Sequence, residues 1–227
     1  MGDTLPLTAI VLAGGLSSRM GQDKALIQFE GVPLLRRTCQ LALECVSEVV
    51  VVTSWPQRYR GLLPNRCTLV QETPLLKQDG EQPIPHGPLV GFAQGLIPVR
   101  TDWVLLLACD LPMLQVEVLQ HWVKDVARAE TAKDHKWING QNSSSAAIAF
   151  LPRHAKGWEP LCGFYHRNCL ADLTAFIAQG GRSFQAWLAQ HPVEELRLPD
   201  KQMLFNCNTP HDLNVIKKKY TSRKIET

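Results

Sequence analysis

Residues 8–24 read TAIVLAGGLSSRMGQDK, an apolar and β-branched run that is followed at once by two glycines, hydroxyls and cations. The run predicts a short buried strand over residues 8–13, because it is continuously apolar and ends at turn-forming residues. Gly14 and Gly15 leave the backbone N–H groups of the turn uncovered, since neither has a side chain. A loop of amides and cations at the carboxyl end of a strand is typical of a polyphosphate site.

The spacing of this loop excludes two common phosphate motifs. The dinucleotide fingerprint needs glycines in a G-x-G-x-x-G frame, whereas here they stand at positions 14, 15 and 21. The ATPase P-loop needs a glycine, a lysine and a hydroxyl in immediate succession, whereas the lysine that follows Gly21 stands at position 24. An ordinary glycine turn followed by a solvated basic loop is the alternative to a phosphate site.

The whole string resembles L-A-G-G-x-S-x-R-M-G-x-D-K, the pattern of the MobA-type nucleotidyltransferases, which are molybdenum cofactor guanylyltransferases. Every fixed position of that pattern is filled. Three later segments resemble the same family: GPLVG at 87–91, ACDLP at 108–112 and NCNTPHDL at 206–213. The resemblance covers nearly the whole chain and is thin only through residues 73–86 and 131–145.

The resemblance implies a Mg²⁺-dependent enzyme that transfers GMP from GTP to the molybdopterin form of the molybdenum cofactor and releases pyrophosphate. The terminal phosphate of the acceptor would attack the α-phosphorus of GTP, which needs positioning and charge neutralisation more than covalent catalysis. GTP and the molybdopterin-type cofactor are then the substrates. Transient contact with molybdenum enzymes or cofactor-insertion proteins is expected.

Other functions stay open on the sequence. A cytidylyltransferase acting on the same cofactor and a sugar-phosphate nucleotidyltransferase belong to the same class of enzyme. Gly14 speaks against the first, because the CTP enzymes typically resemble L-A-A-G at this point. A non-catalytic nucleotide-binding or cofactor-delivery protein is the alternative from another class, and the presence of Lys24 and Asp110 argues against it.

Asp110 is the most informative carboxylate of the sequence. It lies in the most apolar predicted strand, residues 102–112, where Pro112 prevents further regular pairing. An aspartate here could cap the next helix or hold Mg²⁺, which proteins usually bind through one or two carboxylates and the phosphates of the substrate. The resemblance to the family's C-D-x-P segment implies the metal. Asn208 is expected as the second ligand, directly or through a water, with Asn206 as the less favoured alternative.

The resemblance also implies which residues carry the reaction. Catalytic roles are expected for Arg19, Lys24 and Asp110, with the two cations neutralising the leaving pyrophosphate. The residues expected to bind the nucleotide are Leu12, Ala13, Gly14, Gly15, Lys24, Thr53, Glu72, Gly87 and Asp110. Thr53 stands where the family often has an asparagine. Glu72 replaces the more usual aspartate as an acceptor for a ribose hydroxyl or guanine.

The order of the predicted elements indicates an α/β fold, a single-domain Rossmann-like nucleotidyltransferase fold with a mainly parallel central sheet and helices on both faces. Later strands are predicted at residues 48–53, 68–72, 146–150, 193–198 and 204–208, with an apolar segment at 159–165. Helices are predicted at residues 33–45, 115–129, 169–179, 183–188 and 210–218, and a further one opens at Gly87. The domain would span residues 1–227, with a loose start at 1–7 and a basic tail at 219–227.

Ligands of such sheets bind outside the carboxyl ends of the strands. The loop at Gly14, and then Thr53, Glu72 and Asp110, all follow or end predicted strands. We therefore expect these residues to meet at one edge of the sheet.

The composition is that of an ordinary globular protein, with 45% hydrophobic and 20% charged residues. A net charge of +3 gives no case for nucleic-acid binding, and no apolar stretch has the length of a membrane span. The first residues lack a secretory pattern, so the chain is expected to be cytoplasmic. The seven cysteines form no C-x-x-C pair, which favours reduced, buried thiols over a zinc site.

Overall fold

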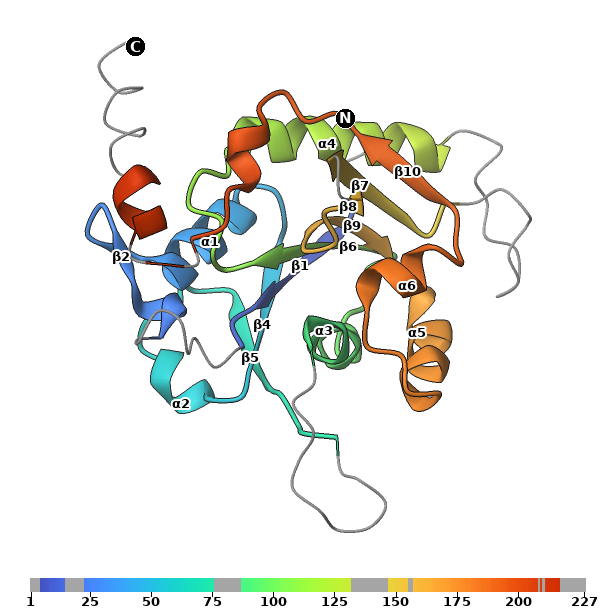
Figure 1. Ribbon diagram of the computed structural model, residues 1–227, viewed down its shortest axis with the longest axis horizontal. Helices are drawn as coiled ribbons and strands as arrows, with labels where there is room; N and C mark the ends of the chain where they lie inside the picture. The colour runs from blue at the N-terminus through green and yellow to red at the C-terminus, as the bar shows by residue number, and fades with distance from the viewer. Residues whose placement is uncertain are drawn as a thin grey trace.

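The computed structural model in Figure 1 describes most of the chain, namely residues 5–14, 23–75, 87–131, 147–154, 157–207, 209 and 211–216. Three of the predicted site residues, Gly15, Arg19 and Asn208, lie outside the described residues. So does most of the two polar segments at 73–86 and 131–145. Among the described residues, no helix is both long and apolar enough to cross a membrane.

An eight-stranded sheet runs through the described part of the chain in the order β10-β7-β9-β6-β1-β4-β5, with β8 paired to β7. The strands are β1 (Leu7–Leu12), β4 (Glu48–Thr53), β5 (Cys67–Gln71), β6 (Trp103–Ala108), β7 (Ala149–His154), β8 (Gly157–Trp158), β9 (Cys162–His166) and β10 (Val193–Leu196). β1 pairs in parallel with β4 and β6, β4 with β5, and β7 with β10. β9 runs antiparallel to both of its neighbours. The predicted, mainly parallel sheet is confirmed.

Helices cover both faces of this sheet, as predicted (Figure 1). They are α1 (Leu34–Leu43), α2 (Pro56–Tyr59), α3 (Pro88–Leu96), α4 (Val116–Thr131), α5 (Cys169–Ala178) and α6 (Phe184–Leu188). The other regular elements of the described residues are the short turns η1 (Lys24–Leu26) and η2 (Lys201–Leu204), the hairpin of β2 (Gln28–Phe29) and β3 (Val32–Pro33), and a helix at 211–216. Ser183 caps α6 as expected, because its side chain accepts from the N–H of Ala186.

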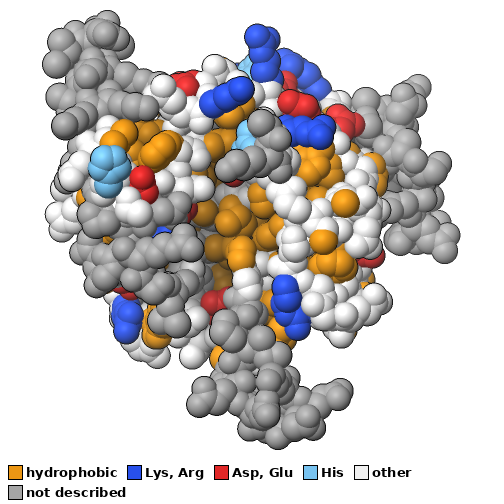
Figure 2. Space-filling view, viewed as in Figure 1, with side chains coloured by type: hydrophobic (Ala, Val, Ile, Leu, Met, Phe, Trp, Pro, Cys, Tyr) orange, Lys and Arg blue, Asp and Glu red, His pale blue; other side chains and the backbone are white. Residues whose placement is uncertain are grey.

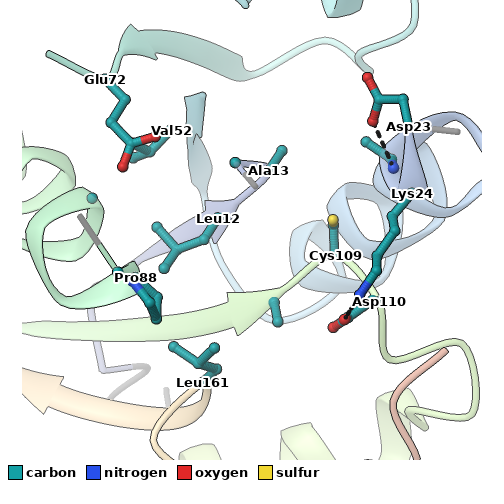
Figure 3. A pocket seen from close by; sticks show the side chains of 15 residues that line it. Leu12, Ala13, Asp23, Lys24, Val52, Glu72, Pro88, Cys109, Asp110 and Leu161 are labelled. Atoms are coloured by element: carbon teal, nitrogen blue, oxygen red, sulfur yellow. Dashed lines mark hydrogen bonds and ion pairs between the residues drawn. The ribbon is translucent and has the colours of Figure 1, made fainter. Parts of the chain in front are cut away.

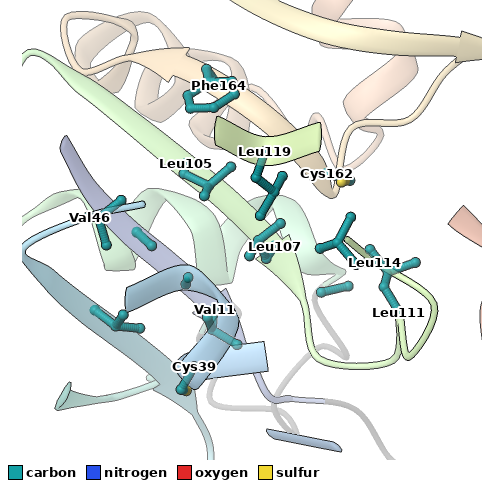
Figure 4. Close-up of a cluster of buried hydrophobic side chains, with 14 of the residues drawn as sticks. Val11, Cys39, Val46, Leu105, Leu107, Leu111, Leu114, Leu119, Cys162 and Phe164 are labelled. Atoms are coloured by element: carbon teal, nitrogen blue, oxygen red, sulfur yellow. The ribbon is translucent and has the colours of Figure 1, made fainter. Parts of the chain in front are cut away.

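Two hydrophobic cores lie on the two faces of β1. One core joins Val11 to α1 and α4, and Figure 4 shows part of it around Leu107 and Leu119. The other joins Ile10 to side chains of α3, α5 and α6. Because both of its faces are covered, β1 is apolar at successive positions rather than alternating. This double burial holds the end of β1 fixed beneath the glycine turn.

The predicted last strand at 204–208 is wrong. Asp200 caps η2 by accepting from the N–H of Gln202, and residues 205–207 follow without strand pairing. The backbone N–H of Cys207 instead donates to the carbonyl oxygen of Asp110, at 3.0 Å. Cys207 is buried in a third small core with Phe29 and Ile216. Of the other apolar residues of the segment, Leu204 packs against the core around Val11 and Phe205 is exposed, so the apolar pattern arises here without a strand.

Smaller differences concern the edges of elements. β7 starts at Ala149 and continues beyond the predicted end to His154, because β10 pairs with it as far as Pro152 and β8 pairs with Arg153 and His154. The apolar segment predicted at 159–165 contributes the antiparallel strand β9. All seven cysteines are free thiols, and Cys45 and Cys67 are half-buried rather than buried.

Candidate active site

A cavity of about 330 Å³ opens at the carboxyl ends of β1, β4, β5 and β6 (Figure 3). It is lined by Leu12, Ala13, Gly14, Asp23, Lys24, Ala25, Val52, Glu72, Gly87, Pro88, Gly91, Ala108, Cys109, Asp110 and Leu161. The face of the molecule in Figure 2 is hollowed near its middle, where hydrophobic side chains gather. The cavity thus has apolar walls. Its charged groups lie at opposite sides, with Glu72 on one and Asp23, Lys24 and Asp110 on the other (Figure 3).

Lys24 and Asp110 form an ion pair in this cavity, with 3.5 Å between Nζ and Oδ2. The two residues are 86 positions apart in the sequence, and the pairing of β1 with β6 brings their segments together. Their side chains are 23% and 18% exposed, so both can still reach a ligand. Burial raises the pKa of the Asp110 carboxyl above its usual range, and the Lys24 ammonium opposes that shift. The pair supplies a cation for phosphates and a hard oxygen for a metal at one place.

Glu72 follows β5, and its carboxylate fits between two glycines. A methyl group added at Gly14 would lie 2.8 Å from Oε2 of Glu72, and one at Gly91 would lie 3.0 Å from Oε1. The hydroxyl of Ser54 donates to the same Oε2 at 3.0 Å. The absence of side chains at positions 14 and 91 therefore gives the carboxylate its place at the cavity. This close approach gives a second physical reason for glycine at position 14.

Thr53 occupies a different position from the one expected. Its side chain is fully buried, and its hydroxyl accepts from the N–H of Trp55 at 3.1 Å. Val52, rather than Thr53, lines the cavity at the end of β4. The carbonyl oxygen of Thr53 accepts from the N–H of Glu72 at 2.8 Å, so Thr53 holds the start of the segment that carries Glu72.

Backbone hydrogen bonds hold the described residues at the end of β1. The N–H of Ala13 donates to the carbonyl oxygen of Val52 at 2.9 Å, and the carbonyl of Leu12 accepts from the N–H of Cys109. These bonds tie the ends of three neighbouring strands together. Gly87 lines the other side of the cavity as the residue before α3, and Pro88 occupies the first turn, as predicted.

The segment that precedes Asn208 lies against Asp110. Cys207 donates its backbone N–H to the Asp110 carbonyl oxygen, and Asn206 next to it is exposed. After it, Thr209 and Asp212 cap the helix at 211–216 reciprocally: the N–H of Thr209 donates to Asp212 at 2.8 Å, and the N–H of Asp212 donates to Thr209 at 3.1 Å. The helix predicted at 210–218 is thus confirmed over residues 211–216.

Several lining residues had no role in the sequence analysis. Asp23 and Gly91 each lie in a quoted motif, so the sequence carried a signal for them. Leu161 carried no signal, because it reaches the cavity only through the pairing of β9 with β6. Within the described ranges, no group of three or more His, Cys, Asp or Glu side chains is arranged to hold a metal ion.

Comparisons with known proteins identify the family of this chain. Residues 9–195 match the family described as "MobA-like NTP transferase domain". The chain is 55% identical over 210 residues to a "Probable molybdenum cofactor guanylyltransferase" of Trichormus variabilis, covering 92% of this chain and 90% of that protein. A protein of the same name from Synechococcus elongatus is 41% identical over 205 residues, covering 90% of this chain and 94% of that protein.

A solved structure supports the fold. The crystal structure of molybdopterin-guanine dinucleotide biosynthesis protein A from Archaeoglobus fulgidus superposes with a TM-score of 0.67 at 21% identity. The match covers 95% of this chain and 99% of that one. From the family match over most of its length and from these relatives, the chain belongs to the MobA-like NTP transferases, in the group of molybdenum cofactor guanylyltransferases.

Proposed function

We propose that this chain transfers GMP from GTP to the molybdopterin form of the molybdenum cofactor and releases pyrophosphate. The observation that carries the proposal is the Lys24–Asp110 pair, 3.5 Å apart, at the edge of the sheet where the glycine turn begins. The names of the relatives at 55% and 41% identity support the choice of substrates. Charge neutralisation and positioning are the main needs of such a transfer.

Each residue has a task in this proposal. Lys24 neutralises charge on the pyrophosphate that leaves, and its ammonium acts most strongly as that charge develops. Arg19 would neutralise charge on the same pyrophosphate. The backbone at Leu12, Ala13 and Gly14, with Gly15, borders the nucleotide. Glu72 accepts from a ribose hydroxyl or from guanine, while Thr53 acts through its backbone contact with Glu72.

The residues present fit a magnesium ion. Asp110 offers a partly exposed carboxylate at the cavity, and Mg²⁺ needs only one or two carboxylates beside the phosphates of the substrate. Asn208 would supply an amide oxygen. This assignment is supported by the hydrogen bond from the N–H of Cys207 to Asp110, which holds the residue before Asn208 at the same edge of the sheet. A bound divalent ion supplies further charge neutralisation on the phosphates.

The test of this function is the release of pyrophosphate. The protein is incubated with Mg²⁺, molybdopterin-type cofactor and one of GTP, CTP or ATP at equal concentration. We expect release with GTP that depends on the cofactor. Release with CTP in its place would favour the cytidylyltransferase alternative. Tight binding of GTP with no release would favour a non-catalytic cofactor-delivery protein. A cytoplasmic location and contact with molybdenum enzymes or cofactor-insertion proteins stay predictions.

A further inference from the structure

Tyr59 is a buried tyrosine whose hydroxyl points at Asp23, the residue directly before Lys24. It ends α2, and only 1% of the residue is exposed. Its O–H donates to Oδ2 of Asp23 at 2.6 Å, a short distance that is typical of a hydrogen bond to an ionised acceptor. Burial, and after it this hydrogen bond, raises the pKa of the Tyr59 hydroxyl, so the phenol stays a neutral donor.

The other oxygen of Asp23 caps the turn that carries Lys24. Oδ1 accepts from the N–H of Ala25 at 3.1 Å, which makes Asp23 the cap of η1. η1 contains only three residues, and so short a turn depends on its cap and its surroundings. Arg58 also approaches Oδ2, at 3.7 Å, but its side chain is 54% exposed and the contact is correspondingly weak.

Lys24 is the first residue of η1 and stands directly after Asp23. Its ammonium lies 3.5 Å from Asp110 at the end of a flexible four-carbon stem. An electrostatic catalytic group is most effective when the protein holds it in place before the reaction. The flexible stem cannot hold the ammonium in place by itself. The capped turn does so in part, because it fixes the backbone from which the stem extends.

We propose that Tyr59 is a positioning residue that holds Lys24 through Asp23. The hydrogen bond from α2 fixes the Asp23 carboxylate, the carboxylate caps η1, and η1 aims Lys24 at Asp110. This role rests on the proposed function, in which Lys24 acts on the phosphates. It adds a residue that lies outside the motif string and outside the cavity lining.

The test is a double-mutant cycle on pyrophosphate release from GTP. Tyr59→Phe removes only the hydroxyl, and we expect kcat to fall by about 10-fold, the scale of one lost hydrogen bond to a charged group. In a Lys24→Ala background the same change should alter the rate by less than about 2-fold, because the group that it positions is gone. Asp23→Asn should lower the rate similarly, and it should add little to Tyr59→Phe.

Tyr165→Phe is the matched control. Tyr165 is also buried, but it lies on β9 rather than beside Lys24. Its hydroxyl donates to the carbonyl oxygen of Pro160 at 2.7 Å. The Tyr165→Phe variant should have a lower thermal midpoint than the original protein, but it should not lose kcat as Tyr59→Phe does.

Three results would overturn the proposal. A Tyr59→Phe variant with normal kcat while Lys24→Ala is slow would exclude the positioning role and leave the proposed function in place. An equal loss in both Lys24 backgrounds would mean that Tyr59 is merely structural. A Lys24→Ala variant with normal turnover would overturn both the role of Tyr59 and the assignment of Lys24.

Discussion

At the scale of single residues, the opposed effects on Asp110 lead to a pH prediction. Burial raises the pKa of its carboxyl, whereas Lys24 and a backbone hydrogen bond lower it, so removal of the lysine leaves the effect of burial less opposed. Because the proposed role of Asp110 needs the ionised form, activity is lost as the pH falls through its pKa. The acid limb of the kcat/KM profile should therefore move to higher pH in Lys24→Ala. Lys24→Arg keeps the positive charge and is the control. An unchanged acid limb in the alanine variant would contradict the coupling.

The sequence identified both members of this pair but not their contact. Lys24 and Asp110 each stand in a motif, and the strand predicted over 102–112 is present as β6, although it ends at Ala108, two residues before Asp110. Their pairing depends on β1 lying beside β6, which no local pattern contains. Tyr59 was missed for the same reason, since its partner Asp23 is 36 positions away and α2 is too short to carry a periodic signal.

At the scale of elements, the carboxylate of Glu72 depends on how β1, β5 and α3 meet. Gly91→Ala should push Oε1 of Glu72 aside, because the new methyl group would lie 3.0 Å from it. We expect the KM for GTP to rise by roughly 10-fold, the scale of a lost hydrogen bond to a charged group. The thermal midpoint should not fall, since alanine favours a helix over glycine by about 1 kcal/mol. In a Glu72→Ala background the same substitution should leave KM unchanged, and a further rise there would refute the explanation.

Strands could be predicted from the sequence wherever an apolar segment is both buried and paired with a neighbouring strand. β4 has the predicted bounds, 48–53, because a strand covered on both faces is continuously apolar. The segment at 204–208 is also rich in apolar residues, yet its backbone bonds to Asp110, Cys207 enters a separate core and Phe205 is exposed. Apolar residues that take no part in strand pairing give the same signal in the sequence, so this error could not be avoided from pattern alone.

At the scale of the whole molecule, ligand binding should raise the thermal midpoint of unfolding. A ligand that binds only the folded chain raises its thermal midpoint, and at equal concentration a tighter ligand raises it further. GTP with Mg²⁺ should therefore raise the midpoint more than CTP or ATP at equal concentration. Glu72→Ala should reduce the difference between the nucleotides if Glu72 contacts the base. A larger rise with CTP than with GTP would contradict the choice of guanine.

The central claim is that Asp110, paired with Lys24 at the carboxyl edge of the sheet, serves the transfer of GMP. The most direct measurement is the rate of pyrophosphate release from GTP by Asp110→Asn, with the molybdopterin-type cofactor and Mg²⁺ present. Asparagine keeps the shape of the side chain, so circular dichroism and thermal melts should report a folded protein. We predict a rate lower by roughly 100-fold or more, the scale seen when one preorganised electrostatic group is removed. A folded Asp110→Asn protein that releases pyrophosphate at nearly the original rate would contradict the account.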